Sequence, residues 1–458
     1  MAIQTVNPAT GMAVKSFPAM TAAEVEDRIA RAHAASAAHR ATSFAQRAAW
    51  MRAAADLLEA EKHDIAATMT LEMGKTRRSA VAEAEKCAKG MRFYAEHAEA
   101  FLADEPLADP AAVGASRAYA AYQPLGVVLA VMPWNFPLWQ VMRFAAPVLM
   151  AGNVGLLKHA SNVPQCALYL EDLFARAGFP AGCFQTLLIG AGAVEGVLRD
   201  PRVAAAAVTG SEPAGRSVGS ICGDEVKPSV LELGGSDAFV VMPSADVAKA
   251  AKVAVTARCQ NNGQSCIAAK RFIVHADVYD EFARLFVEGM QALVVGHPME
   301  DGTDVGPVAT EGGRQDLEEL VEDAAKNGAR ILCGGQRIDG PGWFYPPTVV
   351  ADVTPAMRIH LEEAFGPVAT LYRVPHIDAA NALANGTSFG LGSNAWTSDA
   401  AEQQRFAGEL VAGAVFINGM TTSYPELPFG GVKRSGYGRE LAAAGIRAFC
   451  NLKTVWVG

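Results

Sequence analysis

The sequence lacks the cysteine patterns of a disulfide scaffold or a zinc site. Its eight cysteines are scattered, with no CxxC pair and no metal-type spacing. This distribution predicts free thiols, a reducing cytoplasm and no metal site. The first residues, MAIQTVNPATG, also lack the basic, apolar and small-residue succession of a secretory signal.

Positive charge is scarce as well. With 39 Lys and Arg against 48 Asp and Glu, the formal net charge is -9 at pH 7. Nucleic acids and anionic membranes bind basic surfaces, so neither is expected as a partner. A small-molecule substrate, even an anionic one, needs only a local cation.

No uninterrupted hydrophobic run spans a membrane length. The longest apolar segment, 126–152, is broken by Pro133, Asn135, Pro137 and Arg143. Prolines and polar residues at these places predict a strand, a turn and a helix rather than a transmembrane helix.

The 458 residues, 51% of them hydrophobic, are enough for two or three domains. The first third is helical in pattern: residues 21–24 and 43–46 have capping-box spacing, and a third helical pattern covers 76–102. Residues 117–123, RAYAAYQ, alternate as an exposed strand does.

From residue 126 the apolar runs GVVLAVM, VGLLKH, FQTLLIG, AAAAVTG and SVLELGG alternate with helical patterns. Strands separated by helices predict a parallel sheet with helices on both faces, an architecture typical of nucleotide-binding domains. The alternation restarts after Gly235 and continues to about Ile417, which indicates a second α/β domain. The terminal run NLKTVWV is expected to pair with RAYAAYQ in a small sheet.

One thiol, Cys266, lies in the polar segment 259–272, CQNNGQSCIAAKRF. A thiol in flexible, polar surroundings near Lys270 and Arg271 can be drawn toward the nucleophilic thiolate. Alternatively, Cys266 is a buried structural thiol, and the two cations, which flank a strand, face away from it.

Two further residues complete a possible reaction centre. Asn135, held between two prolines after a strand, can donate an amide N–H to an oxyanion, or satisfy its own turn. Glu232, an acid in the apolar strand LELGG, is either a general base with a raised pKa or a core carboxylate bound to backbone amides.

Other polar groups follow predicted strands. Helical periodicity places Arg143 and Trp139 on one face, and a buried arginine needs a protein carboxylate or a substrate anion as partner. Lys158 suits a ribose or phosphate, and the helix start at 210–215 suits a pyrophosphate. The segment 190–196 reads GxGxxxG rather than GxGxxG, so it is not expected to bind phosphate.

The motifs PWNFP, LELGG, GQSC, EAFGP and PFGG occur here in the order and at the spacings of the aldehyde dehydrogenases, which the chain resembles over nearly its whole length. Within that family it is most similar to bacterial NADP-using succinate-semialdehyde dehydrogenases, on the stretches KHASNVPQCALYLEDLF, NNGQSCIAAKRFIVHAD and NGMTTSYPELPFGGVKRSGYGRE.

The resemblance implies a cysteine mechanism that oxidises succinate semialdehyde to succinate with NADP. Cys266 would form a thiohemiacetal and then a thioester, Asn135 and the Cys266 N–H would bind the oxyanion, and Glu232 would activate the hydrolytic water. The implied substrate-binding residues are Arg143, Trp139 and Ser423. The implied cofactor-binding residues are Trp134, Asn135, Lys158, His159, Ala160, Ser161, Gly210, Ser211, Leu233, Glu363 and Phe365.

Two departures from the family pattern refine this expectation. Many NAD-using relatives carry an acid where this chain has Ser161, so a 2′-phosphate has room and NADP is preferred over NAD. Ala268 stands where some relatives have a second cysteine, so their regulatory disulfide is not expected. Another short aliphatic or ω-carboxylic aldehyde, such as glutarate semialdehyde, is the alternative substrate.

The resemblance implies an α/β fold: a Rossmann-type cofactor domain, a second α/β catalytic domain and a small β oligomerisation element. The expected boundaries are 1–116 with 126–234, 235–430, and 117–125 with 437–458. A homodimer or homotetramer is implied. A cysteine hydrolase would need a paired histidine, for which the nine histidines offer no motif.

Overall fold

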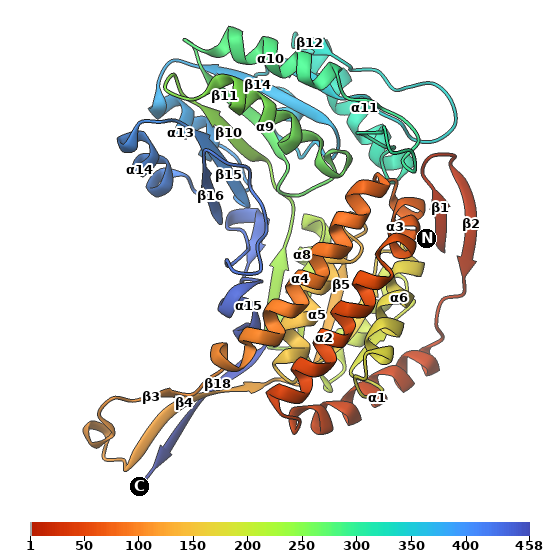
Figure 1. Cartoon of the computed structure of the whole chain (residues 1–458), viewed down its shortest axis with the longest axis vertical. Helices are drawn as coiled ribbons and strands as arrows, with labels where there is room; N and C mark the ends of the chain where they lie inside the picture. The colour runs from red at the N-terminus through yellow and green to blue at the C-terminus, as the bar shows by residue number, and fades with distance from the viewer. Residues whose placement is uncertain (1) are drawn as a thin grey trace.

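The computed structural model describes residues 2–458. The chain begins with a two-stranded antiparallel hairpin and continues into a layer of helices. These elements are β1 (Ile3–Asn7), β2 (Met12–Phe17), α1 (Ala22–Arg40), α2 (Phe44–Ala60), α3 (Lys62–Met73) and α4 (Arg77–Phe101). In Figure 1, α2 and α4 lie side by side in front of the first large sheet.

The predicted helix starts in this layer are confirmed. Thr21 and Glu24 form a full capping box at the start of α1. Ser43 caps α2 by accepting the Gln46 N–H, without the reciprocal bond. Thr76 caps α4, whose span matches the predicted helix.

The first large sheet has six strands in the order β17-β9-β8-β5-β6-β7, all parallel except β17. Its strands are β5 (Val127–Met132), β6 (Val154–His159), β7 (Phe184–Thr186), β8 (Val203–Thr209), β9 (Ser229–Glu232) and β17 (Gly436–Tyr437). Its helices are α5 (Trp139–Met150), α6 (Pro164–Arg176), α7 (Val194–Arg199) and α8 (Glu212–Asp224). This is the Rossmann-type arrangement that the strand–helix alternation predicts.

The second sheet has seven strands in the order β12-β13-β14-β11-β10-β15-β16, and only β12 is antiparallel. Its strands are β10 (Asp237–Val241), β11 (Ala269–His275), β12 (Arg330–Cys333), β13 (Thr348–Ala351), β14 (Val368–Val374), β15 (Gly392–Trp396) and β16 (Ala414–Ile417). Its helices are α9 (Val247–Cys259), α10 (Tyr279–Gln291), α11 (Glu311–Lys326), α12 (Arg358–Leu361), α13 (Ile377–Asn385) and α14 (Ala400–Glu409).

After Asp237, every residue of strand β10 is apolar, and the packing of the strand explains this pattern. Ala238 and Val240 pack into one core cluster, whereas Phe239 and Val241 pack into another. Because successive side chains point to opposite faces of a sheet, a strand covered by helices on both sides is buried throughout.

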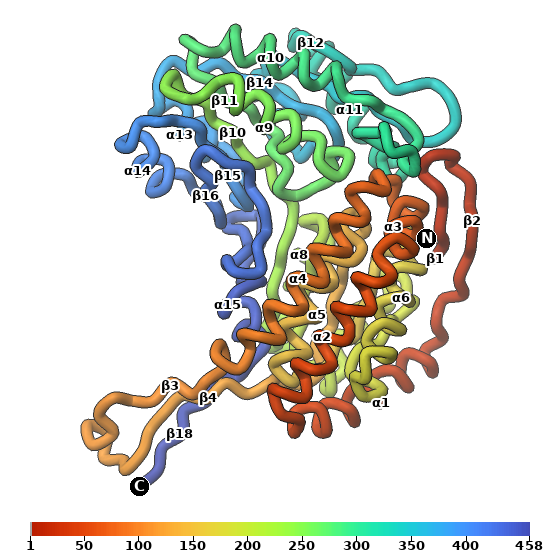
Figure 2. The backbone as a smooth tube through the Cα atoms, viewed as in Figure 1, coloured from red at the N-terminus to blue at the C-terminus, as the bar shows by residue number. Residues whose placement is uncertain are grey.

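A three-stranded sheet projects from the body of the molecule and ends near the C-terminus (Figure 1; Figure 2). It consists of β3 (Glu105–Pro106), β4 (Arg117–Pro124) and β18 (Cys450–Val457), in the order β18-β4-β3. Strands β18 and β4 pair antiparallel, with Val457 opposite Arg117, as the sequence predicts. Tyr437, which the sequence grouping places with this element, instead pairs with Leu231 in the first sheet.

The segment 126–152 forms β5, a turn and α5, which confirms the sequence interpretation. No helix within residues 2–458 is long and apolar enough to cross a membrane. Helix α5 is buried at every position, and α15 (Ala442–Arg447) lies beside it and α4 near the base of the projecting sheet (Figure 1).

Candidate active site

The loop that carries Cys266 is rigidly held rather than flexible, which corrects the sequence expectation. Asn261, Asn262 and Gly263 follow α9 with φ of 55°, 58° and 73°. Asn and Gly adopt this left-handed region most readily. The buried Asn262 amide donates to the Gly74 and Pro307 carbonyls at 2.8 and 3.0 Å, so the loop is tied to segments far away in the sequence.

The two cations that follow Cys266 point in different directions. Lys270 Nζ donates to the carbonyls of Ser265 and Cys266 at 3.0 and 2.8 Å. It also pairs with Glu363 Oε1 at 3.0 Å. Lys270 therefore faces the loop, contrary to the alternative in which both cations face away.

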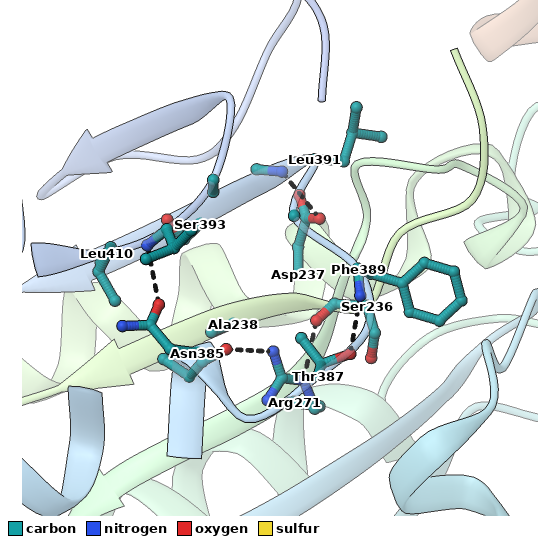
Figure 3. A pocket seen from close by; sticks show the side chains of 15 residues that line it. Ser236, Asp237, Ala238, Arg271, Asn385, Thr387, Phe389, Leu391, Ser393 and Leu410 are labelled. Carbon is teal, nitrogen blue, oxygen red and sulfur yellow. Dashed lines mark hydrogen bonds between the residues drawn. The ribbon is translucent and has the colours of Figure 1, made fainter. Parts of the chain in front are cut away.

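Arg271 does face away from the thiol. Its guanidinium donates to three backbone carbonyls, those of Ser236, Leu383 and Ala384. Figure 3 shows the contacts with Ser236 and Ala384 in a small pocket of about 10 Å³, beside the buried Asp237; Cys266 is not among its lining residues. Arg271 thus fixes the second sheet to α13 and does not act on Cys266 directly.

Cys266 is partly exposed, and its backbone N–H donates to no acceptor within residues 2–458. Burial of its surroundings raises the pKa of the thiol to about 11, against the opposing effects of Arg143 and Lys270. Cys259 is buried, with its Sγ 3.6 Å from Met290 Sδ. Cys266 is therefore a neutral thiol with an unused N–H beside it.

Asn135 lies against the same loop. Its Nδ2 donates to the Gln264 carbonyl at 3.2 Å, and its own carbonyl accepts from Asn261 Nδ2 at 2.7 Å. One amide hydrogen therefore remains for another acceptor. The structure brings Asn135 and the loop of Cys266 together, as the sequence predicts.

Glu232 ends β9 with a carboxyl group that is buried and has no hydrogen-bond partner within residues 2–458. The alternative of a core carboxylate bound to backbone amides is therefore wrong. Burial and the negative charge of Glu440 raise its pKa well above the usual range, while Arg143 and Arg439 lower it. A buried carboxyl group of raised pKa has the character of a general base.

A pocket of about 180 Å³ opens onto Cys266 and contains all three residues predicted to bind substrate, Trp139, Arg143 and Ser423. Arg143 Nε pairs with Glu440 Oε2 at 2.8 Å, and its guanidinium lies 4.5 Å from the Phe429 ring centroid. The sequence left two partners open for Arg143, a protein carboxylate or a substrate anion. In the structure Arg143 pairs with a protein carboxylate and also lines the pocket.

Helix α4 contributes a half-buried lysine that the sequence analysis missed. Lys86 lines the pocket, and its Nζ donates to Ser423 Oγ at 2.9 Å. It also lies 4.5 Å from the Trp139 ring centroid. Burial lowers its pKa to about 8, and the charge of Arg143 acts in the same direction.

Glu83, one turn earlier in α4, was missed too. Its Oε1 accepts the N–H groups of Leu138 and Trp139 at 2.8 and 2.9 Å. These are orphan donors at the start of α5, whose own N-cap residue makes no side-chain bond. The other oxygen of Glu83 pairs with the fully buried Lys75. The signal that could have identified Glu83 and Lys86 was the presence of charged residues on a face of α4 that is otherwise buried.

At the carboxyl edge of the first sheet, Lys158 and His159 are the last two residues of β6, and Ala160 and Ser161 follow them. Lys158 is mostly buried, which lowers its pKa. The side chain of His159 is occupied internally: Nε2 contacts the Pro137 carbonyl at 2.9 Å and Nδ1 accepts the Ala160 N–H. Burial lowers its pKa to about 4, so the neutral ring braces the turn that carries Asn135 and is not free for a ligand.

The next strand end supplies the start of α8. Gly210 donates its N–H to the Glu232 carbonyl, and Ser211 is the N-cap of α8 but makes no side-chain cap bond. N–H groups of the first turn are therefore available for an anion. Leu233, also predicted to contact the cofactor, is buried where α8 packs closely, since a Cβ on Gly215 would lie 2.4 Å from Leu233 Cδ2.

The remaining predicted cofactor residues lie near each other. The rings of Trp134 and Phe365 meet edge to face, with centroids 5.7 Å apart. Glu363, besides pairing with Lys270, accepts the Gly235 N–H at 3.2 Å. A side chain at Gly234 would lie 2.3 Å from Glu363 Oε2, which explains a glycine at that position.

Comparisons with known proteins agree with the motifs. The profile described as the aldehyde dehydrogenase family matches residues 1–455. Succinate-semialdehyde dehydrogenase (NADP(+)) 1 of Mycobacterium tuberculosis is 69% identical over 457 residues, covering 100% of both chains. The corresponding Mycobacterium leprae enzyme is 67% identical over 457 residues, again with 100% of both chains covered.

Among solved structures, the succinic semialdehyde dehydrogenase of Streptococcus pyogenes in complex with NADP+ is 37% identical. It superimposes with a TM-score of 0.96, and 100% of each chain is covered. The aldehyde dehydrogenase-like α/β fold expected from the sequence is thereby confirmed. This chain belongs to the aldehyde dehydrogenase family.

Proposed function

We propose that the protein oxidises succinate semialdehyde to succinate with reduction of NADP. The observation that carries this proposal is the pocket in which the Cys266 thiol shares one cavity with the Arg143 guanidinium and the Ser423 hydroxyl. A thiol at one side accounts for reaction with an aldehyde, and a buried cation with a hydroxyl accounts for a carboxylate at the far end of the substrate. Relatives with 67–69% identity carry the same activity in their names.

In the first step, the Cys266 thiol transfers its proton to solvent water, and the resulting thiolate attacks the aldehyde carbon to form a thiohemiacetal. The carbonyl oxygen becomes an oxyanion, which accepts hydrogen bonds from the free Cys266 N–H and the remaining N–H of Asn135 Nδ2. Both donors are fixed before the substrate arrives, because the loop is tied through Asn261 and Asn262. Preorganised donors stabilise developing charge without reorganisation.

Several features of the structure fit NADP as the cofactor. The start of α8 at Ser211 has uncapped N–H groups for the pyrophosphate, and Lys158 supplies a cation at the adjacent strand end. We propose that Ser161 leaves room for the 2′-phosphate and that Glu363 binds a ribose hydroxyl. When bound, NADP supplies the hydride acceptor that converts the thiohemiacetal into a thioester.

Glu232 then activates water to hydrolyse the thioester. Its unpartnered carboxylate oxygens take the proton of a water, whose oxygen attacks the thioester carbon, and the Cys266 thiolate leaves. A raised pKa makes Glu232 a stronger base once ionised, while Arg143 favours the ionised form. Succinate is released when the thioester bond breaks.

The proposal is tested by a matrix of aldehydes against NAD and NADP, followed at the absorbance of the reduced cofactor. Succinate semialdehyde with NADP should give the highest kcat/KM. A higher kcat/KM for glutarate semialdehyde or an uncharged aldehyde would favour the alternative substrate class. Ester hydrolysis without any aldehyde oxidation would contradict the dehydrogenase assignment.

We also propose that the projecting sheet joins subunits in a homodimer or homotetramer. Strand β18 is an edge strand, and its Leu452, Trp456 and Val457 are 56%, 54% and 41% exposed. Exposed edges that carry apolar side chains favour pairing with another chain. Light scattering on the purified protein gives the subunit number directly.

The expected division into a cofactor unit (1–116 with 126–234), a catalytic unit (235–430) and a terminal element (117–125 with 437–458) is a proposal as well, supported by the two large sheets. A cytoplasmic location is supported by the eight free cysteines.

A further inference from the structure

Ser423 is held so that its hydroxyl must donate into the pocket. Trp139 Nε1 and Lys86 Nζ both donate to Ser423 Oγ, each at 2.9 Å. An indole N–H and an ammonium can only donate, so both lone pairs of this oxygen are in use. The Ser423 hydrogen finds no acceptor in the part of the chain that the structure describes, although the residue is only 4% exposed.

Three hydrogen-bond donors therefore line the pocket: the Ser423 hydroxyl, the Lys86 ammonium and the Arg143 guanidinium. Only Arg143 has a protein anion, since Glu440 lies beside it at 2.8 Å. Lys86 makes no ion pair with any residue from 2 to 458; its neighbours are the Ser423 oxygen and the Trp139 ring. A half-buried cation that has no anion within this part of the chain is suited to bind one from outside.

We propose that Lys86 is a specificity-determining residue, which binds the distal carboxylate of the substrate directly and orients Ser423 to donate to the same group. This inference rests on the proposed oxidation of an ω-carboxylic aldehyde. A carboxylate accepts from all three groups, whereas an alkyl end leaves them without partners. Lys86 thus separates semialdehydes from uncharged aldehydes of the same length.

The charge of Lys86 responds to pH near neutrality. Burial lowers its pKa to about 8, and Arg143 of α5 lowers it further. Glu83 and Cys87 of α4 and Cys266 of the catalytic loop oppose this shift. Because the cationic form binds the carboxylate, discrimination in favour of the semialdehyde should be complete below pH 8 and should weaken as the pH rises above it.

The test is the ratio of kcat/KM for succinate semialdehyde to kcat/KM for butanal, measured from pH 7 to 10 with saturating NADP. Ionisations that both substrates need, those of Cys266 and Glu232, cancel in this ratio. In the wild type the ratio should fall as the pH rises through about 8, since kcat/KM reports the free enzyme. This measurement needs no variant and so does not depend on folding of a mutant.

Lys86→Met keeps the apolar stem against Trp139 and removes the charge. It should lower the ratio at pH 7 on the order of tenfold to hundredfold, the value of a hydrogen bond between charged groups, and make it independent of pH. Lys89→Met is the matched control, since Lys89 lies on the same helix and pairs with Glu426 at the surface. Its ratio should equal that of the wild type at every pH.

A wild-type ratio that is flat from pH 7 to 10, or a Lys86→Met ratio equal to that of the wild type, overturns the inference. Either result leaves the proposed function intact if the wild type still prefers succinate semialdehyde. A wild type that prefers butanal at pH 7 contradicts the proposed function instead.

Discussion

Arg143 and Glu440 form an ion pair in which both side chains are buried, 2% and 6% exposed, with Nε 2.8 Å from Oε2. The charge of Arg143 acts on both Cys266 and Glu232, since it lowers the pKa of each of them. Glu440 acts in the opposite sense on Glu232. The Arg143 guanidinium therefore lines the pocket and also interacts with two carboxyl groups, those of Glu232 and Glu440.

Replacing Arg143 should affect stability and substrate binding separately. Arg143→Met leaves Glu440 buried without a partner, which costs about 3–5 kcal/mol in the free energy of unfolding. The KM for succinate semialdehyde should rise at least tenfold, while that for butanal changes little. Denaturant unfolding and the two KM values measure the two effects.

The double variant Arg143→Met with Glu440→Gln separates them. It removes the unpaired carboxylate, so most of the lost stability should return, but the KM for succinate semialdehyde should stay high. If KM rises equally for both aldehydes in both variants, Arg143 does not bind the substrate carboxylate.

Glu440→Gln alone should shift the pH dependence of turnover. The negative charge of Glu440 raises the pKa of Glu232, and its removal frees Arg143 to act on Glu232 as well. The pKa of Glu232 should therefore fall, and the acidic limb of kcat should move to lower pH. A limb that moves to higher pH, or does not move, would show that these carboxyl groups are not coupled in the turnover step.

Much of this site follows from the sequence because local patterns encode it. Asn135 lies between two prolines, Glu232 ends an apolar strand and Cys266 sits in an amide-rich loop, and each is recognisable within a few residues. The second sheet follows as well, since β10 is apolar after Asp237 and packs into core clusters on both of its faces.

Lys86 and Glu440 could not be predicted in this way. Lys86 reaches Ser423 across 337 positions, and Glu440 meets Arg143 only after the C-terminal segment folds back onto α5. In a helix, the sequence indicates which residues share a face but not which distant group that face will meet. The sequence left the direction of Lys270 open, and its side chain turns back to its own loop.

The reactivity of Cys266 should depend steeply on pH. Burial raises its pKa to about 11, so only about one thiol in a thousand is ionised at pH 8. In the cofactor-free protein, alkylation by iodoacetamide should therefore accelerate about tenfold per pH unit between pH 8 and 10, because the thiolate is the nucleophile.

Saturating NADP should shift this alkylation profile to lower pH, since the positive nicotinamide favours the thiolate. Cys266→Ala should abolish the fast alkylation, because the other thiols are buried, except Cys450, whose pKa is raised by burial to about 12. A profile that is flat with pH would show that the thiol is already ionised in the free protein.

Ser161→Glu should reverse the cofactor preference. A carboxylate in this place would repel the 2′-phosphate of NADP and accept hydrogen bonds from the ribose hydroxyls of NAD. We expect the ratio of kcat/KM for NADP to that for NAD to fall at least a hundredfold, about 2.7 kcal/mol. The control Ser161→Ala removes only a hydroxyl and should keep a preference for NADP.

A wild-type kcat/KM with NAD that equals or exceeds the value with NADP would contradict this assignment of Ser161 before any variant is made.

Glu232→Gln should separate the two halves of the reaction. The amide keeps the shape of the side chain but cannot accept a proton from water, so thioester hydrolysis should slow by about 10²–10⁴-fold. Thioester formation does not need this base if Cys266 is deprotonated by another route. Rapid mixing should therefore reveal a burst of reduced cofactor, close to one per active site, followed by slow turnover. A burst that is lost in proportion to the steady-state rate would place Glu232 before hydride transfer, as the base that deprotonates Cys266.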